Sequence, residues 1–232
     1  MSNIEADLEC DFCNELNGED NLYWKVAEKY SLPRNRMIYE SKNWVIWPTI
    51  GAIVPGYVLI VSKRHRISMM DCDKKEIVEL ESLLKETRRI LESIYRMPCI
   101  MFEHGGVCGI SNKPSCIDHC HLHVLPIRED IYDKIDVDKF KIIEFKSLNE
   151  FYKRIKHSGS YLLYQNHKEQ FCIMHANTYI SQYFRQLIAL SEGLPEKWNW
   201  RYNYFVENIN KTINDINLKL SSSGLDMNLD KW

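Results

Sequence analysis

The stretch "HCHLHVL", residues 119–125, places a histidine at every second position inside an apolar run. Side chains of a β-strand alternate between its two faces, so we expect His119, His121 and His123 to share one face, about 6.5–7 Å apart. The residues between them, Cys120, Leu122 and Val124, suit a buried face. The whole chain has eight histidines. Three within five residues indicate a functional site rather than an ordinary solvent-exposed face, because imidazoles can ligate metals and can take part in proton and phosphoryl chemistry.

The segment before this strand supports phosphoryl chemistry. "CIMFE", residues 99–103, is typical of a buried strand, and "HGGVCGISNKPSCID", residues 104–118, is a glycine-rich loop. Glycine lets backbone N–H groups approach a polyanion closely. Two strands joined by one loop usually pair antiparallel. We therefore expect a phosphate to lie over the imidazoles, although such a loop can also be a simple connector.

The rest of the first half predicts an α+β fold. Residues 44–47 and 57–61 are apolar runs separated by a turn at Pro55-Gly56, which predicts two strands. Residues 74–95 repeat apolar side chains at three- and four-residue steps after the N-cap candidate Asp73, which predicts an amphipathic helix. Pro98 follows its end. A sheet with a helix packed on one face is the expected architecture.

The second half is more polar. "SYLLYQNHKEQFCIM", residues 160–174, predicts a hairpin that turns at residues 165–168. Residues 178–190 and 202–220 are expected to be helical, and the final "SSSGLDMNLDKW" to be frayed. Gln182 and Arg185 lie about one helical turn apart and could reach a second phosphate, a role that we do not predict. We expect a domain at residues 1–130 and a C-terminal extension, mixed α and β, at residues 131–232.

Composition limits the partners and the compartment. The formal net charge of −2 gives no electrostatic reason to expect long nucleic acid or an anionic membrane as a partner. No window approaches the ~20 apolar residues of a membrane-spanning helix, and the acidic N-terminus does not resemble a signal peptide. The eight cysteines are therefore expected to be reduced thiols or metal ligands in a cytoplasmic protein.

"HCHLHVL" resembles the motif of the histidine triad superfamily, in which three histidines alternate with hydrophobic residues. "VPGYVLIVSKRH", residues 54–65, is similar to the family's strand that ends in a Lys-x-His element. "MFEHGGVCGISN", residues 101–112, resembles the phosphate loop of the galactose-1-phosphate uridylyltransferase branch. The resemblance covers roughly residues 10–127, and it implies an antiparallel sheet with a packed helix.

The resemblance also implies a mechanism. His121 would attack the α-phosphorus of a nucleotide and form a nucleotidyl-histidine intermediate, and His123 would hydrogen-bond the phosphate or the leaving-group oxygen. Ser115 stands where the family places a phosphate-contacting Gln or Ser. The resemblance further implies substrate contacts from the loop residues His104, Gly105, Ser111 and Asn112. The uridylyltransferase branch commonly has Gln in the third position, whereas members with a third histidine are mostly hydrolases. Hydrolysis is therefore expected, and phosphorolysis or transfer remains open.

"CDFC" places Cys10 and Cys13 in a C-x-x-C pair, which alone is compatible with zinc, redox chemistry or chance. Zinc needs four ligands in a tetrahedron. Zinc-containing members of the superfamily complete such a pair with the histidine that ends the Lys-x-His strand and with the first triad histidine. Here these residues are His65 and His119, so the resemblance implies a structural zinc. The alternative is a buried pair of reduced cysteines.

Three functions compete at this point. The first is a nucleotide hydrolase or transferase that acts through His121 on a dinucleoside polyphosphate, a phosphoramidate or a nucleotide sugar. The second is a metalloenzyme that uses the alternating histidines as a catalytic metal cradle. The third is a nucleotide-binding module without turnover. No organic cofactor is expected. Members of the superfamily are commonly homodimers, so the resemblance implies a homodimer. The C-terminal extension could change this oligomeric state.

Overall fold

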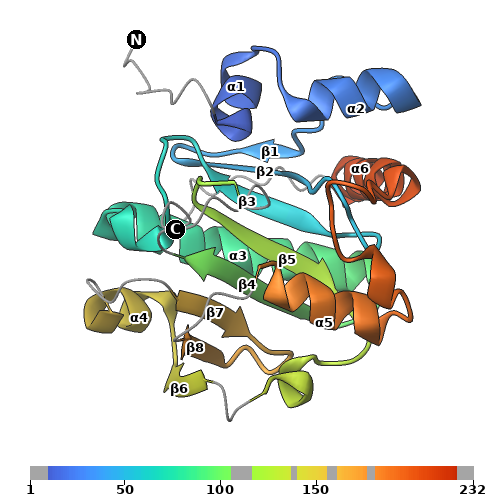
Figure 1. Cartoon of the computed structure of the whole chain (residues 1–232). Helices are drawn as coiled ribbons and strands as arrows, with labels where there is room; N and C mark the ends of the chain where they lie inside the picture. The colour runs from blue at the N-terminus through green and yellow to red at the C-terminus, as the bar shows by residue number, and fades with distance from the viewer. Residues whose placement is uncertain (1–9, 106–116, 137–139, 156–160, 177–180, 224–232) are drawn as a thin grey trace.

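Eight strands form one sheet in the order β1-β2-β3-β5-β4-β7-β8-β6, and every neighbouring pair is antiparallel (Figure 1). The computed structural model of the protein describes residues 10–105, 117–136, 140–155, 161–176 and 181–223. The strands are β1 (Tyr39–Glu40), β2 (Trp44–Pro48), β3 (Val58–Ser62), β4 (Cys99–Gly105), β5 (His121–Pro126), β6 (Phe140–Phe145), β7 (Tyr161–Gln165) and β8 (Phe171–Ala176). The predicted α+β class with an antiparallel sheet is confirmed.

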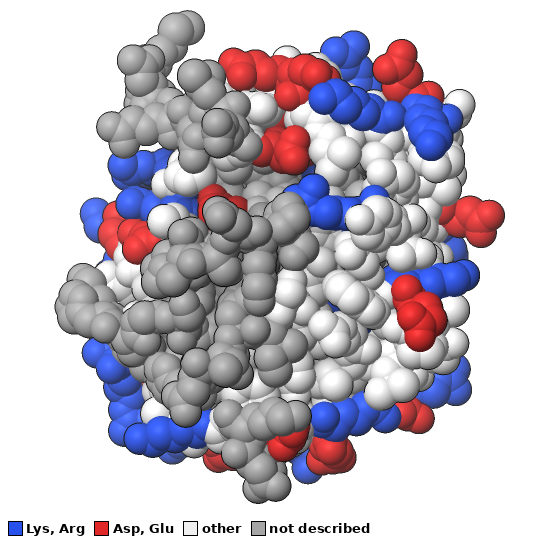
Figure 2. Space-filling model, in the orientation of Figure 1, with Lys and Arg blue, Asp and Glu red and all other residues white. Residues whose placement is uncertain are grey.

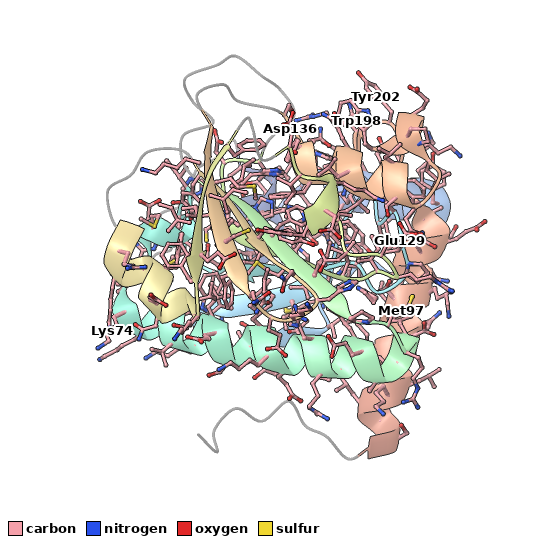
Figure 3. All side chains as sticks on the ribbon, turned by 90° about the horizontal axis from the view of Figure 1, so that it is seen from below. Lys74, Met97, Glu129, Asp136, Trp198 and Tyr202 are labelled. Carbon is pink, nitrogen blue, oxygen red and sulfur yellow. The ribbon has the colours of Figure 1, made fainter. Side chains whose placement is uncertain are left out.

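Helices surround this sheet. The long helix α3 lies along one face, and α5 and the segment around Trp198 lie on the other (Figures 1 and 3). The helices are α1 (Asp11–Asn17), α2 (Leu22–Tyr30), α3 (Lys74–Tyr95), α4 (Leu148–Ile155), α5 (Tyr183–Ser191) and α6 (Val206–Ser223). In the described part of the chain, no helix has the length and apolar character needed to cross a membrane. On the face that Figure 2 shows, acidic and basic side chains are interspersed.

Helix α3 begins and ends as local sequence rules require. The side chain of Asp73 accepts hydrogen bonds from the backbone N–H groups of Lys75 and Glu76, and Glu76 accepts one from the Asp73 N–H, which completes a capping box. The helix ends at Arg96, whose φ of +56° closes the last turn. Its apolar face, which includes Ile77 and Leu84, is buried against the sheet. The predicted helix at residues 74–95 is thus confirmed.

The strand that carries the histidines is shorter than the sequence predicts. β5 begins at His121, whereas His119 lies in a bend before it. The expectation that all three histidines project from one face of a strand is therefore wrong for His119. Tertiary contacts explain this difference. The backbone N–H of Cys120 donates to the Arg66 carbonyl, and the Cys120 carbonyl accepts from the backbone N–H of Ser62. The chain leaves regular strand geometry there. The His119 ring turns toward the N-terminal arm, the segment that carries Cys10 and Cys13.

The C-terminal extension continues the sheet of the first half. β7 pairs with β4 through five residue pairs centred on Glu103 and Leu163. On either side of this junction the strand order is mirrored, with β3-β5-β4 facing β7-β8-β6. A helix precedes each junction strand: α3 precedes β4, and α4 precedes β7. The extension therefore has the topology of a smaller second copy of the first half. No internal repeat is recognisable in the sequence. The predicted boundary near residue 130 stays a prediction.

The second half has no histidine at the positions that correspond to His121 and His123. In the first half Phe102 pairs with His123, and in the second half the corresponding pair is Leu162 and Met174. Met174 and Cys172 thus stand where β5 carries His123 and His121. Both are buried in the core on the same face as the first-half residues. The alternating histidines are therefore confined to the first half of the sheet, and the corresponding positions of the second half contribute to the core.

Two predicted helix boundaries need correction. The helix expected at residues 178–190 is α5, which begins at Tyr183, and residues 177–180 lie outside the described part of the chain. The helix expected at residues 202–220 is α6, which begins at Val206 and includes the serines 221–223 that we expected to be frayed. The helix begins late because Phe205 has a positive φ of 51°, outside the right-handed region. The predicted hairpin is confirmed as β7 and β8.

Glu103 is a buried carboxyl group whose ionisation should control part of the stability. It lies on the α3 side of β4, accepts hydrogen bonds from the Tyr161 hydroxyl (2.6 Å) and the Met69 N–H (2.8 Å), and is 1% exposed. Burial raises its pKa to about 7, and the nearby Asp71 adds to this effect. The folded protein therefore holds a proton that the unfolded chain loses at lower pH, so this contribution to stability is greatest in acid and is lost as pH rises to about 7.

We expect the Glu103→Gln variant to lack this pH dependence. The free energy of unfolding of the wild type minus that of the variant should fall by about 3 kcal/mol between pH 4.5 and pH 7.5 and then stay constant. Urea unfolding across this range measures the difference, in which the contributions of the histidines cancel. A difference that is the same at every pH would contradict the prediction.

Candidate functional site

His121 is held in one tautomer by the backbone. Its Nδ1–H donates to the carbonyl oxygen of His119 at 2.5 Å. A neutral imidazole that donates through Nδ1 keeps the lone pair on Nε2. Burial lowers the pKa of His121, so the neutral form predominates near pH 7. The ring of Phe12 packs edge-on against His121 at 5.3 Å. The result is an oriented, neutral imidazole with a lone pair on Nε2.

His123 is held by ring contacts and at one nitrogen. Its ring stacks on Phe102 at 4.3 Å, and its centroid lies 4.8 Å from that of His121. Its Nδ1 is 2.9 Å from the Tyr57 hydroxyl, and the Arg185 guanidinium lies 5.5 Å from the centre of the Tyr57 ring. A Tyr57 O–H that donates to Nδ1 leaves the proton of the neutral ring on Nε2.

The electrostatic setting favours neutral imidazoles. Burial, together with neighbouring His121, His104 and Arg185, holds the pKa of His123 well below its usual value. Burial lowers the pKa of His104 to about 3. Burial also raises the pKa of Tyr57 to about 12, so the hydroxyl stays protonated. The site can therefore donate and accept hydrogen bonds at neutral pH with one positive charge, that of Arg185, beside the histidines.

A pocket opens over these histidines. The lining residues are Phe12, Arg36, Thr49, Ile50, Leu59, His104, Ile117, His121, His123, Gln182, Arg185 and Trp200. None of these described residues is acidic, and both charged ones are arginines. The pocket therefore suits an anionic ligand with an apolar or aromatic part.

Four side chains from distant segments form a second cluster next to the pocket. The ligand atoms of Cys10, Cys13, His65 and His119 all lie within 4.8 Å of one another. The Nδ1 of His119 is 3.3 Å from the Cys10 sulfur and 3.5 Å from the Cys13 sulfur, and the Nδ1 of His65 is 3.3 Å from Cys13. In the described residues this is the one such group of three or more His, Cys, Asp or Glu residues.

The geometry of this cluster fits zinc. Tetrahedral ligands at the usual Zn–S and Zn–N distances are separated by about 3.6 Å, close to the separations found here. The Nε2–H of His119 donates to the Ser62 carbonyl at 2.6 Å, which directs Nδ1 toward the sulfurs in the way that outer-shell partners orient ligands. Burial raises the pKa of Cys10 to about 12, so a cation is needed to hold this thiol as a thiolate. Bound zinc would be enclosed by these four ligands and would have a structural role.

Several predicted substrate contacts are not part of this geometry. Ser115, Ser111 and Asn112 lie outside the described residues. His104 lines the pocket, and its Nε2 is buried without a hydrogen-bond partner among the described residues. Gly105 does not line the pocket. A Cβ at Gly105 would lie 1.9 Å from the Tyr161 ring, so glycine is required there for packing. Substrate contact by Gly105 stays a prediction.

The pocket also contains residues that sequence reasoning missed. Tyr57 is part of an apolar run and gave no signal of its contact with His123. Arg36 is buried and donates to both carboxylate oxygens of Glu15 at 2.7 and 2.6 Å. It also donates to the carbonyl of Pro48 at the end of β2, so it connects α1 to β2. Gln182 and Arg185 come from the C-terminal extension. Their spacing had raised the idea of a phosphate contact, but nothing in the sequence placed them near His121.

Comparisons with known proteins agree with the motif. No family model matches the chain. In sequence, the chain is 24% identical to the nitrilase and fragile histidine triad fusion protein NitFhit of Drosophila melanogaster, over 44% of this chain and 23% of that protein. The chain thus matches less than a quarter of that relative's length.

Solved structures of histidine triad proteins are also similar. A Hit-like protein involved in cell-cycle regulation from Bartonella henselae is 15% identical, with a TM-score of 0.40 over 53% of this chain and 79% of that chain. A Zn-bound histidine triad family protein from Mycobacterium smegmatis is 19% identical, with a TM-score of 0.41 over 53% of this chain and 78% of that chain.

The fold and the site match what the sequence motif implies. Part of the motif lies on β5 beside a pocket, and the antiparallel sheet with its packed helix is the one that the resemblance implies. The sequence comparison, which finds a fragile histidine triad fusion protein, agrees with this resemblance. The closer resemblance to the uridylyltransferase branch stays a prediction.

Proposed function

We propose that this protein is a nucleotide hydrolase that forms a covalent nucleotidyl intermediate on His121. Its substrate is a nucleotide with a leaving group on the α-phosphate: a dinucleoside polyphosphate, a phosphoramidate or a nucleotide sugar. The observation that carries the proposal is the 2.5 Å hydrogen bond from His121 Nδ1 to the His119 carbonyl, which leaves Nε2 with its lone pair beside the pocket.

The reaction proceeds in two displacements. In the first, Nε2 of His121 attacks the α-phosphorus, the P–N bond forms, and the bond to the leaving group breaks with its electron pair. His123 hydrogen-bonds the departing group, which takes any proton that it needs from solvent. In the second, water attacks the phosphorus, the P–N electron pair returns to Nε2, and the proton of the water is released to solvent, so the enzyme is regenerated. Splitting the displacement in this way replaces one hard step with two easier ones.

The metalloenzyme alternative is not supported by the described geometry. His119 faces Cys10 and Cys13, whereas His121 and His123 line the pocket. The three histidines therefore do not converge on one ion, and no Asp or Glu is among the described residues that line the pocket. A nucleotide-binding module without turnover remains the second candidate, because a bound nucleotide would need the same pocket.

A labelling experiment tests the proposal. The full-length protein is incubated with α-³²P-labelled dinucleoside polyphosphates, phosphoramidates and nucleotide sugars, quenched in alkali to preserve the P–N bond, and digested. We expect label on the peptide that contains His121, together with release of the labelled nucleoside monophosphate. Binding without label or product would support the binding module and overturn the proposal.

Three properties accompany this proposal and rest on the sequence. We propose that the protein acts in the cytoplasm, binds no long nucleic acid, and forms a homodimer. The homodimer has a structural constraint, since β4 is already paired with β7 and offers no free edge to a second copy. A dimer would therefore use another surface, and sedimentation analysis of the purified chain measures its mass.

A further inference from the structure

We infer that Arg185 and Gln182 bind a second phosphate group of the ligand, on the leaving-group side of the α-phosphate. The inference rests on the proposed function, because it takes a nucleotide to occupy the pocket over His121. It deepens that proposal by selecting one substrate class: nucleotides whose leaving group carries its own phosphate, over phosphoramidates whose leaving group is an amine.

Arg185 is a buried cation without an anionic partner among the described residues. Its side chain lies in the pocket wall with the residue 3% exposed. Its Nε donates to the Trp198 carbonyl at 2.9 Å and one Nη2–H to the Gly51 carbonyl at 2.6 Å, and its guanidinium lies over the Tyr57 ring, 5.5 Å from the ring centre. Trp198 lies on the side of the sheet away from α3 (Figure 3). Burying a charge in this way is costly unless an opposite charge offsets it.

The other arginine in the pocket shows the contrast. Arg36 is equally buried, but Glu15 neutralises it through two hydrogen bonds. No described carboxylate lies within ion-pair distance of Arg185. The two backbone carbonyls hold the guanidinium in place without neutralising it. Its positive charge is therefore available to a ligand in the pocket. A guanidinium matches the geometry of phosphate and carboxylate groups, and of these a nucleotide supplies phosphate.

Gln182 supplies independent support. The residue is 3% exposed and lines the same pocket, yet neither its Oε1 nor its Nε2 has a hydrogen-bond partner among the described residues. Buried amides are nearly always hydrogen-bonded, so an unpartnered one calls for an explanation. A nucleotide with a second phosphate satisfies both atoms: Nε2 donates to a phosphate oxygen, and Oε1 accepts from a hydroxyl or amino group of the same ligand.

Binding measurements test this subsite without requiring turnover. Isothermal titration of the full-length zinc-loaded protein compares each nucleoside monophosphate with its diphosphate, for all four bases, in buffer without added divalent cation. We expect the wild type to bind the diphosphate about 10- to 100-fold more tightly for the preferred base, as a charge-assisted hydrogen-bonded contact predicts. Arg185→Gln should reduce this ratio to below about 3. Equal affinities in the wild type would overturn the inference.

Gln182→Met separates a ligand-binding role from a structural one. Methionine keeps the volume and removes two polar atoms that have no described protein partner, so the melting temperature should stay the same or rise. The preference for the diphosphate should nevertheless fall several-fold. Arg154→Gln is the matched control, because Arg154 is an exposed arginine of the same extension that does not line the pocket, and it should leave the preference unchanged. If Arg185→Gln does not fold, Arg185→Lys takes its place, since lysine keeps the charge but loses the planar fork.

Folded Arg185 and Gln182 variants that retain the full diphosphate preference would overturn the inference. The two proposals fail separately. Label on His121 without a diphosphate preference leaves the reaction and removes the subsite. A preference that both variants lose, without label on His121, leaves the subsite and removes the reaction.

Discussion

Replacing His121 with alanine is expected to abolish turnover, with a loss in kcat of about 10⁴-fold or more. The variant loses the only atom that can form the P–N bond, and binding by the remaining pocket cannot replace a nucleophile. The side chain is partly exposed in the pocket, so its removal should cost little stability. Steady-state release of nucleoside monophosphate, measured beside a melting curve, tests both parts of the prediction.

His167→Ala is the matched control for this prediction. His167 lies in the β7–β8 turn, away from the pocket lining, with its Nδ1 3.8 Å from Asp130. We expect it to retain turnover within a factor of two or three. A His121→Ala protein that folds and keeps a tenth or more of the wild-type rate would show that the reaction does not pass through this residue.

Removing the metal site is expected to have the largest effect on stability. Cys10 and Cys13 belong to the N-terminal arm, and His65 and His119 to the segments before and after α3, so a bound zinc ion joins three parts of the chain. Metal analysis should find one equivalent of zinc in the wild type and none in Cys13→Ala. The variant should lose several kcal/mol of unfolding free energy, because zinc bound only by the folded state stabilises it by mass action.

Cys172→Ala controls for the loss of a buried thiol. Cys172 is also a buried, reduced cysteine, but it lies on β8 within the apolar core. This variant should keep its zinc and lose only the stability expected for a small cavity. A wild-type protein that contains no metal after purification in zinc-containing medium would contradict the metal site directly.

The cluster formed by Cys10, Cys13, His65 and His119 also affects the orientation of His121. The backbone carbonyl that accepts from His121 Nδ1 belongs to His119, whose side chain is in the cluster. The metal site and the nucleophile are therefore connected through one residue. The reason for the bend before β5 is visible here: His119 must leave the strand for its ring to reach Cys10 and Cys13, while its carbonyl remains at the start of β5.

Local patterns were sufficient for much of the fold. The capping residue Asp73 and the apolar spacing of α3 depend only on neighbours within the helix, and both predictions held. The strands at residues 44–48 and 58–62 and the hairpin of β7 and β8 were predictable for the same reason. The start of β5 was predicted two residues too early, because its position depends on contacts with Ser62 and Arg66 that lie far away in the sequence.

By itself the sequence determined the order of strands and helices from β2 to β5, the two faces of β5 and the candidate nucleophile, since each depends on side-chain periodicity over a few residues. It did not predict α1, α2 or β1. Tertiary structure alone decided that β7 covers the edge of β4 and that α5 brings Gln182 and Arg185 to the histidines. Arg185 contacts Gly51 across 134 residues of chain. Such contacts arise from the packing of whole elements, which a local pattern does not encode, and they place a lone buried cation where the second phosphate is proposed to bind.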